Sequence, residues 1–371
     1  MLYVLVNNNY HIDDFERYHV FSPNEKSVLI RIPHTLNLED PYTKKFNKVL
    51  TFQSPFRGIK SLLKYSKIIG TLSSVREAIK PTAEDTLIFF TDFEILNQYI
   101  VSLFKNAGSK VIMLEDGMAT VTVGNMTSHQ LSFKDRLHKW GLKNIYGLRF
   151  VDFVGENKLS LLPVIADHYV DAVGLSIKSP FKRNISVFQL KVKEQQVAGL
   201  KMDTVIFINQ DIYNFIDISF DNYLAFLKNV FKELEMKFKT VYFKFHPRET
   251  EPFRAMVKEA ASSFPAILFV DDFKTPVERQ VEIFQPQYAV SFYSNSLRSL
   301  YFRGVEPFFL YHLLSEVKDT QLGVTMTSYL NYLEYNFIST IDDIKPGYKS
   351  GIKLDADHIT LNELISIVKS K

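Results

Sequence analysis

Cysteine is absent from this sequence of 371 residues. Its absence excludes a disulfide framework, a zinc–thiolate site and a cysteine nucleophile. Long apolar runs are missing as well, because no stretch approaches the ~18–20 uninterrupted apolar residues that a membrane-spanning helix needs. The apolar run at residues 2–6 has no basic leader and turns polar at residues 7–9, so it predicts a buried strand rather than a signal peptide. We therefore expect a cytoplasmic protein.

Net charge is small, since 44 Lys and Arg residues against 41 Asp and Glu residues leave +3. This balance does not indicate nucleic acid as a partner. Residues 134–149 are a local exception, where cations surround apolar side chains. The cations are Lys134, Arg136, His138, Lys139, Lys143 and Arg149, and the apolar residues are Leu137, Trp140, Leu142 and Ile145. Such a stretch is typical of peripheral contact with the inner membrane face or an acidic glycan, or else of a solvated helix with a buried stripe.

Tryptophan is scarce too, with one residue against 32 Phe and 19 Tyr. Many phenylalanines lie in strand-like runs such as residues 87–90, which favours a role in core filling. The apolar share of 46% and the charged share of 23% are ordinary for globular proteins. Because 371 residues exceed what one core comfortably holds, we expect two domains.

Short runs of Val, Ile, Leu, Phe and Tyr alternate with segments of helical length. We expect strands at 2–6, 28–32, 86–91, 110–114 and 150–154, and again at 204–208, 239–244, 267–270, 288–292 and 307–310. Expected helices include 221–237 with Asp221 as N-cap, 251–263, and 361–368 after Thr360. Strands that are apolar on both faces are typical of parallel sheets covered by helices, so the pattern predicts an α/β fold.

The expected strand series breaks between about residues 155 and 203. This break predicts two Rossmann-like domains, 1–175 and 185–371, whose parallel sheets face a central cleft. For the last helix, packing against the first domain is the alternative to packing within the second.

An acidic pair follows the expected strand at 110–114, in the order Glu115, Asp116 and Gly117. Ligands of open parallel sheets gather beyond the carboxyl ends of strands. Neighbouring carboxylates raise each other's pKa, which suits a general base, and the glycine permits a tight turn. The alternative is a plain acidic turn between a strand and a loop.

A histidine follows the expected strand at 239–244, in the order His246, Pro247, Arg248 and Glu249. The proline fixes the backbone and biases His246 towards an extended conformation. The imidazole could then protonate a departing phosphate or donate a hydrogen bond to it, and Arg248 could add charge or pair with Glu249. The alternative is a loop histidine satisfied by backbone groups.

Small polar residues follow the expected strand at 288–292, namely Ser294, Asn295 and Ser296. Hydroxyls and backbone N–H groups at a helix N-terminus can hold a phosphate. Plain N-capping by serine is the alternative.

The three motifs together resemble those of the bacterial sialyltransferases, which share an Asp/Glu-Asp/Glu-Gly, a His-Pro and a Ser-Ser/Thr motif. Residues 115–117 and 246–247 match the first two, and residues 294–296 match the third loosely because Asn295 separates the serines. The His-Pro-Arg extension is most similar to the lipooligosaccharide sialyltransferases, with the capsule polysialyltransferases next.

The resemblance implies a GT-B-type, inverting, metal-independent enzyme without a cofactor. It would transfer sialic acid from CMP-sialic acid to a galactoside or sialoside acceptor of a bacterial surface glycan, either lipooligosaccharide or capsule. The resemblance also implies roles for individual residues. Glu115 is the base, Asp116 orients it or shares its role, His246 serves the leaving CMP phosphate, Ser294 and Ser296 bind that phosphate, and Gly117, Pro247, Arg248 and Asn295 complete the substrate site. A glutamate upstream of the serines would read cytosine, with Glu282 as first choice and Glu278 as competitor.

Two other functions fit the same pattern. One is another GT-B transferase that uses CMP-Kdo or a UDP- or GDP-sugar. The other is a non-catalytic protein of this fold that binds a nucleotide or a glycan. A hydrolase is disfavoured because the sequence lacks a Gly-x-Ser-x-Gly elbow. The sequence sets no oligomeric state.

Overall fold

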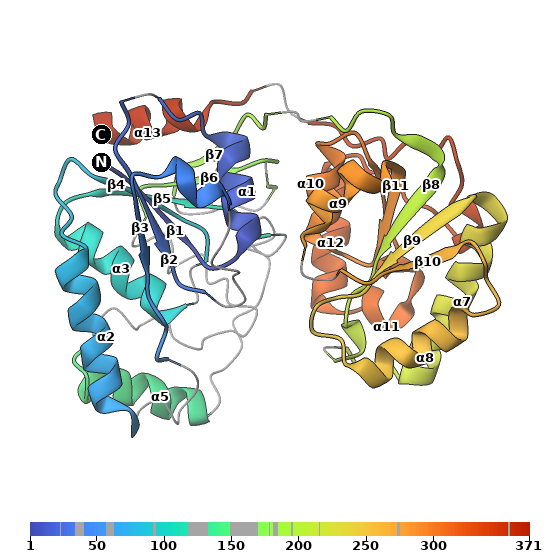
Figure 1. The fold of residues 1–371 in the computed structure, drawn as a ribbon, viewed down its shortest axis with the longest axis horizontal. Helices are drawn as coiled ribbons and strands as arrows, with labels where there is room; N and C mark the ends of the chain where they lie inside the picture. Colours follow the sequence, from blue (N-terminus) through green and yellow to red (C-terminus); the bar gives the residue numbers. More distant parts are fainter. Residues whose placement is uncertain are drawn as a thin grey trace. The chain divides into compact units, whose positions relative to one another are not determined.

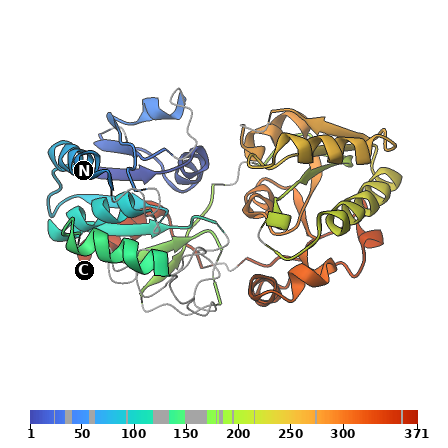
Figure 2. The ribbon, with the colours of Figure 1, turned by 90° about the horizontal axis from the view of Figure 1, so that it is seen from below.

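The chain folds as two units, each built on its own parallel sheet (Figure 1). Unit 1 comprises Met1–Lys193 and Asp355–Lys371, and unit 2 comprises Glu194–Leu354. The computed structural model describes residues 1–22, 24–33, 41–56, 63–91, 94–117, 133–148, 170–177, 179–180, 185–193, 196–214, 216–272, 275–354 and 357–371. Both chain ends lie in unit 1 (Figures 1 and 2).

Unit 1 contains a sheet of seven strands in the order β3-β2-β1-β4-β5-β6-β7, and each neighbouring pair is parallel. The strands are β1 (Leu2–Val6), β2 (Ser27–Arg31), β3 (Lys48–Thr51), β4 (Thr86–Phe89), β5 (Lys110–Leu114), β6 (Ala172–Leu175) and β7 (Val187–Gln189). The side chains of β1, β2 and β4 are buried throughout, as expected for strands covered on both faces.

The described helices of unit 1 are α1 (Asn9–Tyr18), α2 (Tyr65–Ala78), α3 (Ile95–Asn106), α5 (Phe133–Asn144) and α13 (Leu361–Ser370). Helices α2 and α3 cover one face of the sheet and α1 covers the other (Figure 1), as right-handed crossovers require. Helix α13 packs against β5 and β6 and buries Leu361, Leu364 and Val368. Thr360 caps it, as the sequence predicts, in a capping box with Glu363.

Unit 2 contains a sheet of five parallel strands in the order β10-β9-β8-β11-β12. Its strands are β8 (Lys201–Ile208), β9 (Thr240–Lys244), β10 (Ile267–Val270), β11 (Pro286–Ser291) and β12 (Glu306–Phe309). Its helices are α7 (Phe220–Lys237), α8 (Glu251–Ala261), α9 (Val277–Phe284), α10 (Asn295–Tyr301), α11 (Ser315–Lys318) and α12 (Gln321–Tyr332).

The abundant phenylalanines fill cores, as predicted. In unit 2, the rings of Phe207 and Phe243 stack at 5.0 Å between centroids, and Phe231 meets Phe243 edge-on at 5.4 Å. These three side chains are fully buried. In unit 1, Phe89 and Phe90 are also buried.

The expected start of the second domain, at residue 185, differs from the observed division, whereas the return of the last helix to the first domain was allowed for. Strand β7 extends the sheet of unit 1, so residues 185–193 belong to that unit and not to the second domain. The C-terminal segment also returns to unit 1, because Ile359 bridges to Leu190 in parallel and its backbone N–H donates to Gln189 O at 3.0 Å.

Nine of the ten expected strands are confirmed, with ends that move by three residues or fewer. The tenth, at 150–154, lies outside the described residues. The expected gap in the strand series between 155 and 203 is wrong, because β6 and β7 fall within it. The N-cap of α7 is Ser219 and not Asp221, since the Ser219 hydroxyl accepts the N–H of Asn222 at 3.2 Å. Asp221 lies in the first turn, where its charge favours the helix dipole.

Candidate functional site

Each sheet reverses its strand order at one point, between β1 and β4 in unit 1 and between β8 and β11 in unit 2. In open α/β sheets, ligands bind outside the carboxyl ends of the strands at such switch points. The three sequence motifs follow β5, β9 and β11, so they lie at the carboxyl edges of the two sheets.

At the edge of unit 1, Asp116 accepts hydrogen bonds from three side chains. The Tyr10 hydroxyl and His11 Nε2 contact Oδ1, the latter at 2.8 Å, and the Thr91 hydroxyl donates to Oδ2. Tyr10 and His11 follow β1, and Thr91 follows β4, so the switch point assembles the cluster. Gly117 has a φ of +105°, which favours glycine and lets the chain turn sharply after the acid pair.

His11 is oriented from both sides of its ring. The backbone N–H of Asn7 donates to Nδ1 at 3.2 Å, so Nε2 is the ring nitrogen that donates its proton to Asp116. The fully buried ring also stacks on Phe90, with centroids 4.5 Å apart and planes 4° from parallel. Asn7 is held in turn by Asn97 and by Ile32 O, so His11 is a rigid donor to the acid pair.

These donors decide the charge of Asp116. Burial opposes its ionisation, but the attraction of His11 and the hydrogen bonds from His11, Thr91 and Tyr10 outweigh it and lower the pKa of Asp116. The Tyr10 pKa is raised well above its ordinary value by burial and by the charge of Asp116. Asp116 is therefore an ionised carboxylate beside a neutral tyrosine.

Glu115 lies on the inner side of the pair. It is buried, and its Oε1 accepts a hydrogen bond from the Tyr18 hydroxyl at the end of α1. Its Oε2 accepts the backbone N–H of Ser176 at 3.0 Å, just after β6. The two acids of the motif therefore face different partners, since Asp116 has a side chain that is 14% exposed and contacts residues after β1 and β4.

At the edge of unit 2, His246 and Arg248 both face Asp211, which follows β8. His246 Nδ1 is 3.4 Å from Asp211 Oδ1, and an Arg248 guanidinium nitrogen is 3.6 Å from the same oxygen. The backbone N–H of Arg248 donates to His246 Nδ1 at 3.3 Å. Burial lowers the pKa of His246; the Asp211 charge opposes this shift and the Arg248 charge adds to it.

Glu249 holds the backbone of the histidine by a hydrogen bond. Its Oε2 accepts the backbone N–H of His246 at 2.8 Å, and its Oε1 accepts Asn209 Nδ2 at 2.6 Å. The Tyr223 hydroxyl donates to Asn209 Oδ1 at 2.7 Å, which continues the network into α7. Burial raises the pKa of Glu249 to about 8, although its hydrogen bonds with His246 and Asn209 lower it. Glu249 therefore positions the turn that carries His246.

The ends of β8 and β11 are joined by Gln210. Its Oε1 accepts the backbone N–H of Tyr293 at 2.7 Å and lies 3.2 Å from the Ser291 hydroxyl. The serine motif begins directly beyond this joint, where the Ser294 hydroxyl caps α10 and accepts the N–H of Ser296 at 3.3 Å. The capping alternative is thus realised for Ser294. The Oδ1 atom of Asn295 is buried without a hydrogen-bond partner in the described structure.

The two glutamates considered for cytosine recognition lie at opposite ends of α9. Glu278 is buried in the first turn, close enough to Lys244 at the end of β9 for its charge to raise that lysine's pKa. Burial is the larger effect and lowers the Lys244 pKa to about 8. Glu282 is exposed in the last turn and accepts a hydrogen bond from Arg303 at 2.9 Å, just before β12. Glu278 therefore lies at the carboxyl edge, and Glu282 lies towards the amino edge.

Sequence analysis missed the residues that hold the motifs in place. They are Tyr10, His11, Thr91, Asn209, Gln210 and Asp211. A usable signal was present, because they too follow buried strands, namely β1, β4 and β8.

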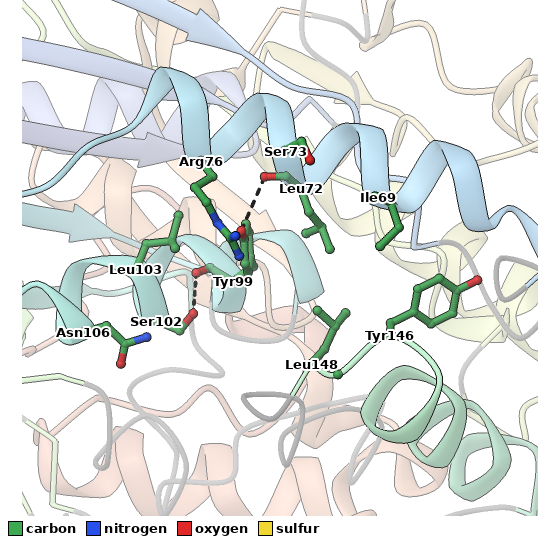
Figure 3. A pocket seen from close by; sticks show the side chains of 11 residues that line it. Ile69, Leu72, Ser73, Arg76, Tyr99, Ser102, Leu103, Asn106, Tyr146 and Leu148 are labelled. Carbon is green, nitrogen blue, oxygen red and sulfur yellow. Dashed lines mark hydrogen bonds between the residues drawn. The ribbon is translucent and has the colours of Figure 1, made fainter.

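A cavity of about 540 Å³ lies elsewhere in unit 1 (Figure 3). Residues of α2 and α3, including Leu72, Arg76 and Tyr99, line it together with Tyr146 and Leu148 beyond α5. It contains none of the predicted site residues. The described parts of the chain contain no group of three or more His, Asp or Glu residues that could hold a metal ion.

A sequence model of the alpha-2,8-polysialyltransferase family matches residues 3–308. The chain belongs to this family. It is accordingly a glycosyltransferase of the sialyltransferase type. The matched range spans the acid pair and the His-Pro motif. The match points to the polysialyltransferases, which the sequence motifs placed second after the lipooligosaccharide enzymes. Comparison with curated proteins found no match.

Solved structures that resemble this family member share its fold. A protein from Listeria monocytogenes assigned as a UDP-N-acetylglucosamine 2-epimerase has a TM-score of 0.55 at 9% identity, covering 100% of this chain and 95% of that one. The UDP-GlcNAc 2-epimerase from Methanocaldococcus jannaschii has a TM-score of 0.50 at 12% identity, with both chains fully covered. A UDP-glucose:anthocyanidin 3-O-glucosyltransferase also scores 0.50 at 12% identity, covering 100% and 93%. The predicted GT-B fold of two parallel-sheet domains is thus confirmed.

The raised pKa of Glu249 predicts how stability depends on pH. The folded state keeps this proton up to about pH 8, whereas the unfolded chain releases it near 4.5, so this contribution is complete below pH 4.5 and is lost as pH rises through 8. Glu249→Gln, which does not titrate, should show a flatter decline in the free energy of unfolding between pH 5 and 8 than the wild type.

Urea titrations followed by circular dichroism at several pH values measure this slope. Glu251→Gln is the matched control, because Glu251 is a neighbouring, solvent-exposed glutamate. Equal slopes for the wild type and Glu249→Gln would show that Glu249 is ionised throughout.

Proposed function

We propose that this family member transfers sialic acid from CMP-sialic acid to a sialoside acceptor of a bacterial surface glycan. The observation that carries the proposal is the family match over residues 3–308. The finer assignment of donor and acceptor draws support from an acid pair at one carboxyl edge and a histidine beside an arginine at the other. A galactoside acceptor, as in lipooligosaccharide, is the neighbouring possibility that the assay below includes.

The proposed step is a displacement with inversion at the anomeric carbon of sialic acid. The acceptor hydroxyl gives its proton to a carboxylate while its oxygen forms the new glycosidic bond. The bond from the anomeric carbon to the CMP phosphate breaks, and its electron pair goes to the phosphate oxygen. His246 donates a hydrogen bond or a proton to that oxygen. We propose that this step needs neither a cofactor nor a metal ion.

Glu115 is the proposed base. Asp116 is a poor proton acceptor, because its pKa is lowered and its oxygens already accept three side-chain hydrogen bonds. We therefore assign Asp116 and its donor His11 to orientation of the turn. The acceptor hydroxyl would donate to Glu115 Oε1, the atom to which the Tyr18 hydroxyl also donates.

His246 is proposed to act mainly as a hydrogen-bond donor to the departing phosphate. Its lowered pKa makes the ring neutral near pH 7, and the contact of Nδ1 with the Arg248 N–H leaves Nε2–H as the donor. Arg248 supplies positive charge at the same turn, and Pro247 fixes the backbone between them. Asp211 faces both side chains and positions them.

Glu278 is now the favoured residue for reading the cytosine of the donor, in place of the first choice Glu282. Its position in the first turn of α9 supports this assignment, because the carboxyl edge is where a nucleotide binds in this fold. Ser294, Asn295 and Ser296 are proposed to contact the phosphate, and the unpartnered Asn295 Oδ1 is a further candidate for the ribose hydroxyls.

The donor assignment predicts which sugar nucleotide is consumed. CMP should be released from CMP-sialic acid in the presence of an α2,8-linked disialyl acceptor, and more slowly with lactose. CMP-Kdo, UDP-sugars and GDP-sugars should not be consumed, and EDTA should not change the rate. Turnover of another donor would favour a different GT-B transferase. Binding of CMP without consumption of any donor would favour a non-catalytic protein.

The base assignment predicts unequal losses within the acid pair. Glu115→Gln should lower turnover by about 10²–10⁴-fold, the usual contribution of a general base, and leave CMP affinity unchanged. Asp116→Asn should lower turnover less, since Asp116 only orients the turn. The CMP-release assay measures both, with Glu77→Gln as the control, because Glu77 is an exposed residue of α2. A larger loss in Asp116→Asn would reverse the two roles.

The role of His246 predicts a difference between two substitutions. A glutamine amide can place a neutral N–H donor near the position of Nε2, whereas alanine cannot. His246→Gln should therefore retain at least tenfold more turnover than His246→Ala. Equal, severe losses in both variants would show that His246 transfers a proton instead of donating a hydrogen bond.

A further inference from the structure

Helix α5 has an exposed apolar side that faces away from its buried side. Phe133, Leu137 and Trp140 are 76%, 43% and 56% exposed, although each is large and apolar. His138 and Leu142 are buried. Sequence analysis left open whether the apolar residues of this stretch are buried. The structure divides them, because Leu142 is buried and Leu137 and Trp140 are exposed.

The three exposed residues form one stripe. Their spacing of four and then three residues places them on the same side of an α-helix, within about 60° of one another at 100° per residue. Leu142 lies about 140–180° away from them by the same geometry. We call residues Phe133, Leu137 and Trp140 the α5 stripe.

Positive charge flanks the α5 stripe. The helix carries four Lys or Arg residues and a single Asp in its sequence. Lys134, Arg136 and Lys143 are exposed side chains on either side of the stripe. An apolar stripe between rows of cations, with a tryptophan on it, is the pattern of a helix that lies in the plane of an anionic membrane surface.

The buried side fixes α5 to the rest of unit 1. Leu142 is fully buried, and its carbonyl accepts the N–H of Leu148 at 3.1 Å, which turns the chain back after the helix. The Tyr146 ring stacks on Tyr65 of α2 with centroids 5.3 Å apart. Tyr146 and Leu148 then line the cavity between α2 and α3 (Figure 3). The stripe could therefore enter a membrane without loss of the contacts that hold the helix.

We propose that the α5 stripe docks this protein on an anionic phospholipid surface. Phe133, Leu137 and Trp140 would enter the boundary between headgroups and acyl chains, and the flanking cations would meet lipid phosphates. Twelve residues make a helix of about 18 Å, too short to cross a hydrocarbon core of about 30 Å. In the described parts of the chain, no helix is long and apolar enough to cross a membrane.

An anionic lipid surface fits the stripe better than a protein partner does. Three side chains on the exposed side of one helix present little of the roughly 800 Å² per partner that a stable protein interface buries. Exposed cations on both flanks match a uniformly negative surface, and they disfavour a second copy that would present the same cations. The inference does not depend on the proposed donor or acceptor.

The experiment uses Trp140, because it is the single tryptophan of the chain. The full-length protein is titrated with vesicles of phosphatidylglycerol and phosphatidylethanolamine, and with vesicles of phosphatidylcholine alone. Fluorescence should shift to shorter wavelength with the anionic vesicles and be quenched by lipids brominated near the headgroup. Phosphatidylcholine should give little change, and high salt should reverse the binding.

Matched variants assign the effect to the stripe. Leu137→Ser should weaken anionic-vesicle binding about tenfold, and Arg136→Gln should weaken it about fivefold, the loss expected for one cation near the surface. Met256→Ser on α8 is the control, since Met256 is also an apolar residue that is 43% exposed on a helix. It should bind as the wild type does.

Three outcomes would overturn the proposal. The first is an unshifted Trp140 spectrum with anionic vesicles. The second is equal binding to anionic and neutral vesicles. The third is a dimer in solution that Leu137→Ser dissociates while vesicles are not bound, which would assign the stripe to an interface between copies of this chain.

Discussion

A carboxylate at the end of a buried strand must find donors, because leaving its charge unpaired in a low-dielectric environment costs several kcal/mol. The edge of unit 1 is organised around this constraint. Tyr10, His11 and Thr91 converge on Asp116, and Asn7 and Phe90 fix the His11 ring in turn. The residues that follow β1, β4 and β5 are thereby tied into one rigid corner.

The edge of unit 2 also surrounds its buried carboxylates with donors, but here basic side chains lie beside the carboxylate. Asp211 is buried beside His246 and Arg248, and Glu249 is held by backbone and amide donors. Here burial lowers the pKa of the histidine and raises that of the glutamate, so both groups favour their neutral forms. A site of this kind can bind a phosphate through hydrogen bonds from neutral donors and the charge of one arginine. Tight packing of aromatic rings beneath it, as between Phe207 and Phe243, supplies the low-dielectric surroundings.

Much of the fold could be predicted from the sequence because parallel strands buried on both faces are almost purely apolar. The runs at β1, β4 and β5 are recognisable for this reason. Strand β3 could not be recognised, since it lies at the sheet edge and is largely exposed, and β7 is only three residues long and half-buried. Strands β3 and β7 form by pairing with the strand next to them in the sheet, β2 and β6 respectively, and not through a local apolar pattern.

The motif residues of the site could also be predicted, but not their environments. The adjacent residues Glu115 and Asp116 accept hydrogen bonds from different partners, because successive side chains at a strand end face opposite sides. Likewise, Glu278 and Glu282 are one helical turn apart, yet they lie near different edges of the sheet. Partners such as Asp211 are distant in sequence from the motifs, and their position after a buried strand does not say which motif they contact.

The return of α13 to unit 1 has a consequence for how the protein is made. Unit 2 is an insertion between β7 and α13, so the chain passes from one unit to the other twice. During synthesis, all strands of unit 2 leave the ribosome before α13, and domains generally fold as units in the order in which they emerge. Unit 1 must therefore wait, with the surface over β5 and β6 uncovered, until unit 2 and the final helix have been translated.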